Sequence, residues 1–312
     1  MDLIANSYPS PAENLAFEEF YFDRFERDTL RLWINPPSVI IGKHQCTLAE
    51  INYPFCEAEH IPILRRISGG GTVYHDHGNI NFSFFRILDQ DHKIDYGTNL
   101  EIIASALRHM GYEITINERF DIYYEEFKIS GNAQHIKRRK ALHHGTILYD
   151  SDEVTLRKSI AKPEATFESK AVQSVRSKIK NLRSVKDVGK AEDFMTHLQN
   201  ELIKQGHQFK SVEAEKLTLS SLVIEKYANP DWNYGYGPKY RFEKSSNGWD
   251  VSLSVARGGD IERAEITFKG ERQSELELNL RRLKHHPPVL TSYISSLNLL
   301  TEAKQNLIES LI

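Results

Sequence analysis

The stretch Arg65-Arg66-Ile67-Ser68-Gly69-Gly70-Gly71-Thr72-Val73-Tyr74-His75-Asp76-His77-Gly78-Asn79 is the feature around which the chain is organised. Three consecutive glycines are a poor interior for a helix or a strand, because each loses more backbone freedom on folding than another residue would. Glycines do allow main-chain N–H groups to converge on an anion, and the two preceding arginines add donors suited to carboxylate or phosphate. Residues 61–64 and 80–84 on either side are apolar and strand-like. The stretch therefore predicts a glycine loop between strands, which serves either as a tight turn or as an anion or nucleotide site. It has neither the Gly-Lys-Ser/Thr of a Walker loop nor the dinucleotide spacing.

Length and composition are those of an ordinary globular chain. Its 312 residues, 40% hydrophobic and 27% charged, suit one large and one small domain. No apolar run approaches the ~18 residues of a membrane span, and Met1–Ala5 has no secretory-signal pattern. We therefore expect no membrane association and a cytoplasmic location. Cys46 and Cys56 are expected to be free thiols, and the histidine pairs lack the spacing of a zinc site.

The net charge of −3 conceals a basic segment. Residues 157–190 hold ten Lys or Arg against three acidic residues, and the run 137–140 adds four more basic residues. Such a block is typical of a solvated face or a mobile loop, and two sharper alternatives are an acidic protein partner or nucleic acid. Few aromatic residues interleave with these charges, which argues against nucleic acid.

Hydrophobic periodicity and turn residues divide the chain into two parts. Up to residue 228 they predict several helices and strands: helices after Asn14 and at 99–110, 191–205 and 213–227, and strands at 30–34, 38–45, 112–116, 120–124, 127–135 and 141–149. The segment 229–239, rich in Gly, Pro and aromatic residues, predicts a linker. After it come three strands, at 240–244, 249–256 and 262–269, and then two or three helices. We expect an α+β protein with domains at 1–228 and 240–312.

Taken together, these motifs resemble the lipoate–protein ligase A family. The glycine stretch is similar to the family's signature, and further similar motifs follow the family's order along nearly the whole chain: Asn14-Leu15-Ala16-Phe17-Glu18, 39–45, Lys128-Ile129-Ser130-Gly131-Asn132-Ala133, 143–148, 174–177 and 232–237. The resemblance implies a biotin/lipoyl ligase-type mixed β-sheet domain with flanking helices plus a small α+β C-terminal domain. It also implies a two-step reaction. The carboxylate of lipoate first attacks the α-phosphate of ATP to give lipoyl-AMP and pyrophosphate, and a lysine of an acceptor domain then takes the lipoyl group as an amide.

The resemblance also implies roles for individual residues. Lys128 would be catalytic, bridging the lipoate carbonyl and the α-phosphate. The implied ATP-binding residues are Arg66, Gly71, Thr72, Val73, Tyr74, Asn79, Asp121 and Lys128. The implied lipoate-binding residues are Gly70, His75, Lys128, His144 and Gly145. Asp121 would also bind Mg²⁺. The chain departs from the family's pattern at Cys46 and at Phe120, where asparagine is expected. The implied partners are acceptor lipoyl domains of 2-oxoacid dehydrogenase subunits or the glycine cleavage H protein, and the implied state is a monomer.

Two other functions stay open at this point. One is an octanoyl or lipoyl transferase on the same fold that uses no ATP, and the other is a non-catalytic binding protein that kept the fold. A cysteine-dependent transferase needs a thiolate near the lysine motif, but residues 120–150 contain no cysteine. The intact glycine run and Lys128 argue against a loss of catalysis. The sequence therefore favours an ATP-dependent ligase.

Overall fold

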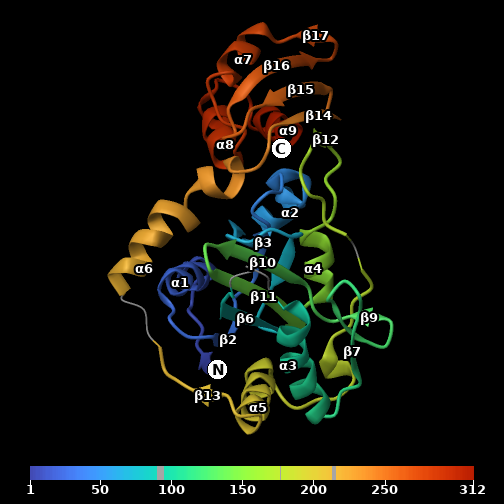
Figure 1. The fold of residues 1–312 in the computed structure, drawn as a ribbon. Coiled ribbons are helices and arrows are strands. Elements are labelled where there is room, and N and C mark those ends of the chain that lie inside the picture. Colours follow the sequence, from blue (N-terminus) through green and yellow to red (C-terminus); the bar gives the residue numbers. More distant parts are fainter. Residues whose placement is uncertain (90–94, 176, 213–215) are drawn as a thin grey trace.

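The computed structural model describes residues 1–89, 95–175, 177–212 and 216–312, which form a large lower body and a small upper one (Figure 1). The start of the helix predicted at 213–227 lies outside the described residues. No helix in the part of the chain that the model describes is long and apolar enough to cross a membrane.

A six-stranded sheet forms the centre of the large body. Its order is β10 (Asn132–Lys137), β11 (Lys140–Leu148), β6 (Asn79–Ile87), β2 (Thr29–Ile34), β1 (Asp2–Ala5) and β13 (Gln208–Phe209). β1 runs parallel to both of its neighbours, and the other pairs are antiparallel. The strands predicted at 30–34 and 80–84 and the hairpin with the basic tip are thus confirmed.

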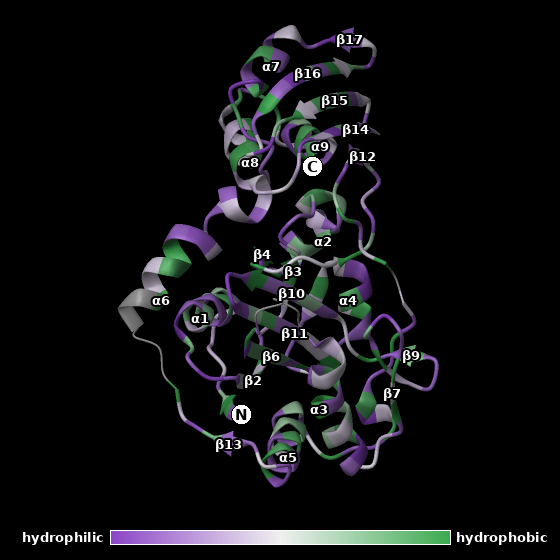
Figure 2. Cartoon of the chain, in the orientation of Figure 1, coloured by the Kyte–Doolittle hydropathy of each residue, from purple (hydrophilic) through white to green (hydrophobic). Residues whose placement is uncertain are grey.

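Helices cover both faces of this sheet. α3 (Tyr96–His109) and α5 (Ala191–Lys204) pack on one face, against a cluster that includes Leu30, Leu32 and Phe82. α1 (Pro11–Arg24) packs on the other face, in a cluster with Trp33 and Phe85. Figure 2 shows hydrophobic and hydrophilic residues alternating along α5, as expected of a helix with one buried face. Because β2 and β6 are covered on both sides, nearly all of their residues are buried, including polar ones such as Arg31 and Asn81.

The glycine loop belongs to a smaller three-stranded sheet, β4 (Ile63–Arg65), β3 (Ser38–Ile41) and β5 (Val73–His75). β3 is the middle strand, parallel to β4 and antiparallel to β5. The loop therefore crosses over β3 to join two edge strands. The strand predicted at 38–45 ends at Ile41, because residues 42–45 turn beneath this loop.

The strand predicted at 127–135 is interrupted. Phe127–Lys128 forms β9 in a third sheet with β8 (Ile122–Tyr124) and β7 (Ile114–Ile116), whereas β10 starts at Asn132 in the central sheet. The break at 129–131 moves Lys128 away from the hairpin register, in which Asn132 pairs with Gly145 and Ala133 with His144. Lys128 therefore stands where two sheets meet.

The small body holds β14 (Tyr240–Ser246), β15 (Trp249–Val255), β16 (Ile261–Phe268) and β17 (Glu271–Arg272). Three helices pack with this sheet: α7 (Ser274–Leu280), α8 (Pro287–Ser296) and α9 (Thr301–Leu311). A strand from much earlier in the chain, β12 (Thr166–Ser169), pairs with β14 at the edge of the sheet. Three further α-helices are α2 (Tyr53–Ala58), α4 (Glu153–Ser159) and α6 (Lys216–Leu222), and short non-α helices follow α6 at Val223–Tyr227 and, within the segment predicted as a linker, at Asp231–Gly235.

Candidate active site

The glycine loop is packed so closely that two positions tolerate no side chain. An ideal Cβ on Gly42 would lie 2.0 Å from the carbonyl oxygen of Gly70, so the two backbones touch. Gly70 itself has φ +82°, a left-handed conformation that residues with a Cβ rarely adopt. The loop conformation therefore depends on glycine at both positions.

The two arginines that precede the loop have different surroundings. Arg65 is fully buried, and its guanidinium donates to carbonyl oxygens of the 42–45 turn, to the carbonyls of Trp232 and Asn233, and to the Thr47 hydroxyl. Those bonds occupy its donors, so the interpretation of Arg65 as an anion-binding residue is wrong. It instead ties the loop to the segment predicted as a linker, where Asn233 is buried.

Arg66 holds the loop from inside. Its Nη2 donates to the carbonyl oxygens of Gly69 at 2.6 Å and Gly71 at 2.7 Å, and its Nε donates to the Ser68 hydroxyl at 2.9 Å. Burial lowers the pKa of the Arg66 guanidinium to about 10, which still leaves it charged at neutral pH. A fixed positive charge therefore lies beneath the glycines.

Two cavities meet at Lys128. One has a volume of about 340 Å³, and Leu15, Trp33 and Ile40 give it an apolar wall. The other has a volume of about 480 Å³ and extends past Tyr74 towards α4 and β12. Lys128 lines both, and its Nζ lies 2.8 Å from Oδ1 of Asp121. A charged lysine at such a junction can contact two ligands at once.

Most of the predicted site residues line these cavities. The first cavity is lined by Arg66, Gly71, Thr72, Val73, His75, Lys128, His144 and Gly145, and the second by Thr72, Val73, Tyr74 and Lys128. Three predicted residues line neither cavity, namely Gly70, Asn79 and Asp121. Asn79 is buried in β6 and donates to Oδ1 of Asn81, which lines the first cavity. Asp121 is connected to the cavities through Lys128.

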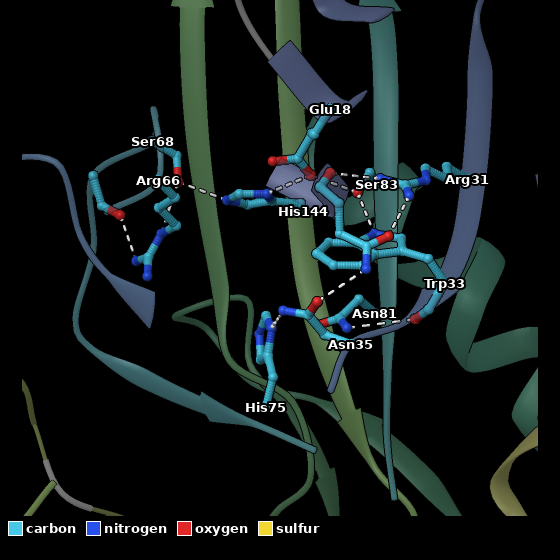
Figure 3. A network of polar contacts seen from close by, with 12 residues as sticks. Glu18, Arg31, Trp33, Asn35, Arg66, Ser68, His75, Asn81, Ser83 and His144 are labelled. Carbon is cyan, nitrogen blue, oxygen red and sulfur yellow. Dashed lines mark hydrogen bonds and ion pairs between the residues drawn. The ribbon is translucent and has the colours of Figure 1, made fainter. Parts of the chain in front are cut away.

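A buried polar network forms the inner wall of the first cavity (Figure 3). His144 lies between Glu18 and Ser68, with Nδ1 2.8 Å from Glu18 Oε1 and Nε2 2.6 Å from Ser68 Oγ. Burial works to raise the pKa of the Glu18 carboxyl, but the hydrogen bonds from His144 and Ser83 and the charge of Arg31 bring it below its ordinary value. Glu18 and Ser68 belong to the motifs that carry the resemblance, yet sequence reasoning gave neither a role, because no pattern placed α1 beside the loop.

His75 offers a neutral hydrogen-bond donor in the same cavity. Burial, and then the charge of Arg66, lower the pKa of His75 to about 3. The Asn35 amide lies 3.1 Å from His75 Nδ1 and donates to it, so the ring carries its proton on Nε2.

Residues 170–175, which belong to the basic segment 157–190, form a cover over the site. Ser174 Oγ accepts hydrogen bonds from the Thr72 amide at 2.9 Å and from the Gln45 side chain at 3.1 Å, and it donates to Glu50. Residues 173–175 line both cavities, and the Lys128 amide donates to the Lys178 carbonyl at 2.9 Å. Residues 174–177 are one of the motifs of the resemblance, but they received no role from the sequence, so Ser174 was missed as an anchor.

Within the described residues, no three His, Cys, Asp or Glu side chains gather as a metal site. Asp121 alone was expected to hold Mg²⁺. One carboxylate does suit this ion, which usually arrives with substrate phosphates and keeps several waters.

Comparisons with known proteins agree with this geometry. Residues 10–203 match the family model of the lipoyl protein ligase A/B catalytic domain. The lipoate-protein ligase LplJ of Bacillus subtilis is 34% identical over 306 residues, covering 93% of this chain and 92% of the relative. The lipoate–protein ligase 1 of Staphylococcus aureus is 33% identical over 84% of this chain and 82% of its own. The chain belongs to the lipoate–protein ligase family, so the resemblance and the enzyme class expected from the sequence motifs are confirmed.

Related structures support the fold and hold both expected small molecules. A lipoate-protein ligase A bound with ATP superposes with a TM-score of 0.63 at 26% identity, covering 75% of this chain and 98% of its own. The P. falciparum protein LipL1, in complex with lipoate, has a TM-score of 0.64 at 22% identity and covers 99% of this chain and 98% of its own, which concerns the fold alone. The α+β fold of lipoate ligases is thus confirmed. The mouse lipoyl amidotransferase LIPT1 is also similar, at 34% identity over 73% of this chain and 64% of its own.

Proposed function

We propose that this protein joins lipoate to protein lysines in two ATP-dependent steps. In the first, a carboxylate oxygen of lipoate bonds to the α-phosphorus of ATP, the bond to the β-phosphate oxygen breaks, and pyrophosphate leaves. In the second, a lysine amine of the acceptor attacks the carbonyl carbon, an amide forms, and AMP leaves while the amine loses a proton to solvent. The observation that carries the proposal is Lys128 at the junction of two cavities.

The first step needs positive charge and amides where negative charge gathers. The lipoyl chain would lie along the apolar wall of the first cavity and the nucleotide in the second. Lys128 would then contact both the carboxylate and the α-phosphate, as preorganised cations do in phosphoryl chemistry. The amides of residues 71–74 would hold phosphate oxygens over the charge of Arg66, and the Thr72 amide would exchange its bond to Ser174 for one to the phosphate. The cover, residues 170–175, would keep water from the acyl-adenylate, because its residues 173–175 line both cavities.

A divalent cation fits this scheme through the nucleotide. Mg²⁺, when bound, would neutralise charge on the leaving pyrophosphate, and Asp121 would supply an oxygen ligand. The Lys128–Asp121 ion pair would also hold the lysine in place before ATP arrives.

The proposed function also includes the acceptor protein, the oligomeric state, the cellular location and the division into domains. Lipoyl domains are the expected acceptors. The support is a structurally similar lipoate protein ligase of Thermoplasma acidophilum, which is described together with its E2 lipoyl domain. We propose the glycine cleavage H protein as a second acceptor. We further propose that the enzyme is a monomer in the cytoplasm, with a catalytic domain at 1–228 and an accessory domain at 240–312.

The alternative is a transferase that needs no ATP, and the similarity to LIPT1 keeps it in view. A thiolate mechanism conflicts with both cysteines. Burial raises the pKa of the Cys46 thiol to about 12 and of the Cys56 thiol to about 11, and neither residue lines either cavity. Cys46→Ser and Cys56→Ser should keep acyl transfer within about threefold of wild type, since a thiol this protonated is a poor nucleophile.

Exchange of pyrophosphate into ATP tests the proposal. A ligase exchanges labelled pyrophosphate into ATP only when lipoate is present, and then modifies a lipoyl domain. Transfer from an acylated protein donor without ATP, together with no exchange, would replace the proposal with the amidotransferase. Neither activity from folded protein would point to a binding protein.

A further inference from the structure

We propose that Glu18 is a positioning residue that fixes the glycine loop through His144 and Ser68, an inference that rests on the proposed function. Glu18 is 1% exposed and lines neither cavity. A buried carboxylate is costly unless it is paired. It lies in α1, far in sequence from the loop, and Figure 3 shows it joined to Ser68 by the His144 ring.

The direction of each hydrogen bond follows from groups that can only donate. Ser68 Oγ accepts from the Arg66 Nε–H, and His144 Nε2 is the one acceptor that its own hydroxyl reaches among the described residues, so the hydroxyl donates to Nε2. His144 then carries its own proton on Nδ1 and donates it to Glu18 Oε1. One orientation of His144 is therefore selected by the two groups at its ends.

A second chain reaches the same oxygen from the opposite side. The Trp33 Nε1–H donates to Ser83 Oγ at 3.0 Å, and the Ser83 hydroxyl donates to Glu18 Oε1 at 2.7 Å. Both chains begin at a residue that lines the first cavity and end on one carboxylate oxygen. Glu18 is thus the common acceptor for the two sides of that cavity.

Arg66 connects this network to the glycine loop. Its guanidinium fixes the carbonyls of Gly69 and Gly71, and its Nε is held by Ser68. If Glu18 no longer accepts from His144, the imidazole is free to move its proton to Nε2, and Ser68 loses its fixed partner. The loop amides would then lose their alignment without any change in the residues that touch substrate. Misplacement by about 1 Å can cost about 100-fold in rate.

The test combines kinetics with the protonation pattern of His144. Glu18→Met removes the acceptor at similar length, and Glu18→Gln keeps an oxygen acceptor for His144 and Ser83. We expect Glu18→Met to lower the kcat of lipoate-dependent exchange between about 10-fold and 100-fold, and Glu18→Gln to stay within about threefold. Glu19→Gln is the matched control, because Glu19 pairs with Lys226 outside this network.

A double variant separates positioning from a general loss of stability. Glu18→Met and Ser68→Ala break one chain at two points, so together they should lower kcat no more than the stronger single change. Losses that multiply, or a folded Glu18→Met protein with wild-type kcat, would overturn the proposal.

Nitrogen-15 NMR of histidine-labelled protein provides a readout that needs no activity. The His144 signals, assigned with His144→Gln, should show the proton on Nδ1 in the wild type. This measurement uses the wild-type protein, so it tests the proposed hydrogen-bond chain even if Glu18→Met does not fold. A wild-type ring protonated on Nε2 alone would refute the chain of bonds. Absence of exchange in the wild type with Nδ1 protonated would instead count against the proposed function.

Discussion

The inner wall of the first cavity is stabilised by buried hydrogen bonds between regular elements, whereas the cover over the cavity is an irregular and partly exposed segment. The wall stands on α1, β6 and β11, and its polar side chains bond to one another in full burial. The cover, residues 170–175, has no regular structure, exposes Val172 by 54% and Val175 by 80%, and is anchored chiefly through Ser174. Segments with few buried contacts open at low free-energy cost, whereas packed networks do not. The difference suggests a preorganised wall for binding and a cover that can open for the acceptor lysine.

Lys128 stands between these two regions, and removing it should have the largest effect. We expect Lys128→Ala to lower lipoate-dependent exchange by about 1,000-fold, because a preorganised cation at the reacting phosphate is lost. Circular dichroism should show a folded protein. Lys180→Ala is the control, since Lys180 pairs with Glu125 and lines neither cavity. Near-normal exchange by Lys128→Ala would remove this lysine from the chemistry.

Acid should destabilise the central sheet that carries the wall, through His143 of β11, whose ring faces α3 on the other side of this sheet. Burial, together with the charge of Arg86, lowers the pKa of His143 to about 3, so the folded protein keeps this ring neutral while the unfolded chain protonates it below about 6.5. Stability is therefore fully present above pH 6.5 and is lost as pH falls, by up to about 1.4 kcal/mol per pH unit for one such histidine.

Urea unfolding at pH 6.5 and pH 5 measures this loss. His143→Gln should lose about 2 kcal/mol less than the wild type over that interval. Equal losses would mean that His143 is not buried neutral. The cover contains no histidine and should add nothing.

The same comparison explains what sequence could predict. The strands of the wall were recognised from local patterns such as the alternation of apolar and polar residues at 80–84, and the glycine motif identified the loop between β4 and β5. Three features were beyond such patterns. Arg65 and Arg66 are identical in sequence but differ in what surrounds them. Glu18 reaches Ser68 only through tertiary packing. The strand β12 pairs with a partner more than seventy residues later, which charge composition cannot indicate.

Ser174→Ala tests the anchor of the cover. It removes the acceptor used by the Thr72 amide and the Gln45 side chain. At about 1 kcal/mol for each of these two hydrogen bonds, we expect lipoate-dependent exchange to fall by between about 5-fold and about 30-fold. Ser184→Ala, whose hydroxyl bonds only to a nearby surface carbonyl, is the control. Wild-type exchange in Ser174→Ala would show that the cover does not depend on this contact.

The smallest effect is expected at the basic tip, which should act only in the second step. Lys137 and Lys140 already contact Asp23, so changing all four basic residues of the tip to Ser would also break contacts within the molecule. Arg138 makes no ion pair or side-chain hydrogen bond within the described structure, so Arg138→Glu reverses its charge without breaking a contact there.

If an acidic acceptor docks at this tip, the apparent KM of Arg138→Glu for the acceptor should rise about threefold at low salt, while exchange with free lipoate stays unchanged. Charges are screened beyond about 8–10 Å at physiological ionic strength, so the increase should shrink as salt rises. Arg263→Glu, on the exposed face of β16, makes the same change in net charge on the small body and should leave the KM unaltered. An equal rise in both variants would assign the effect to net charge, and no rise in Arg138→Glu would remove the tip from the docking surface.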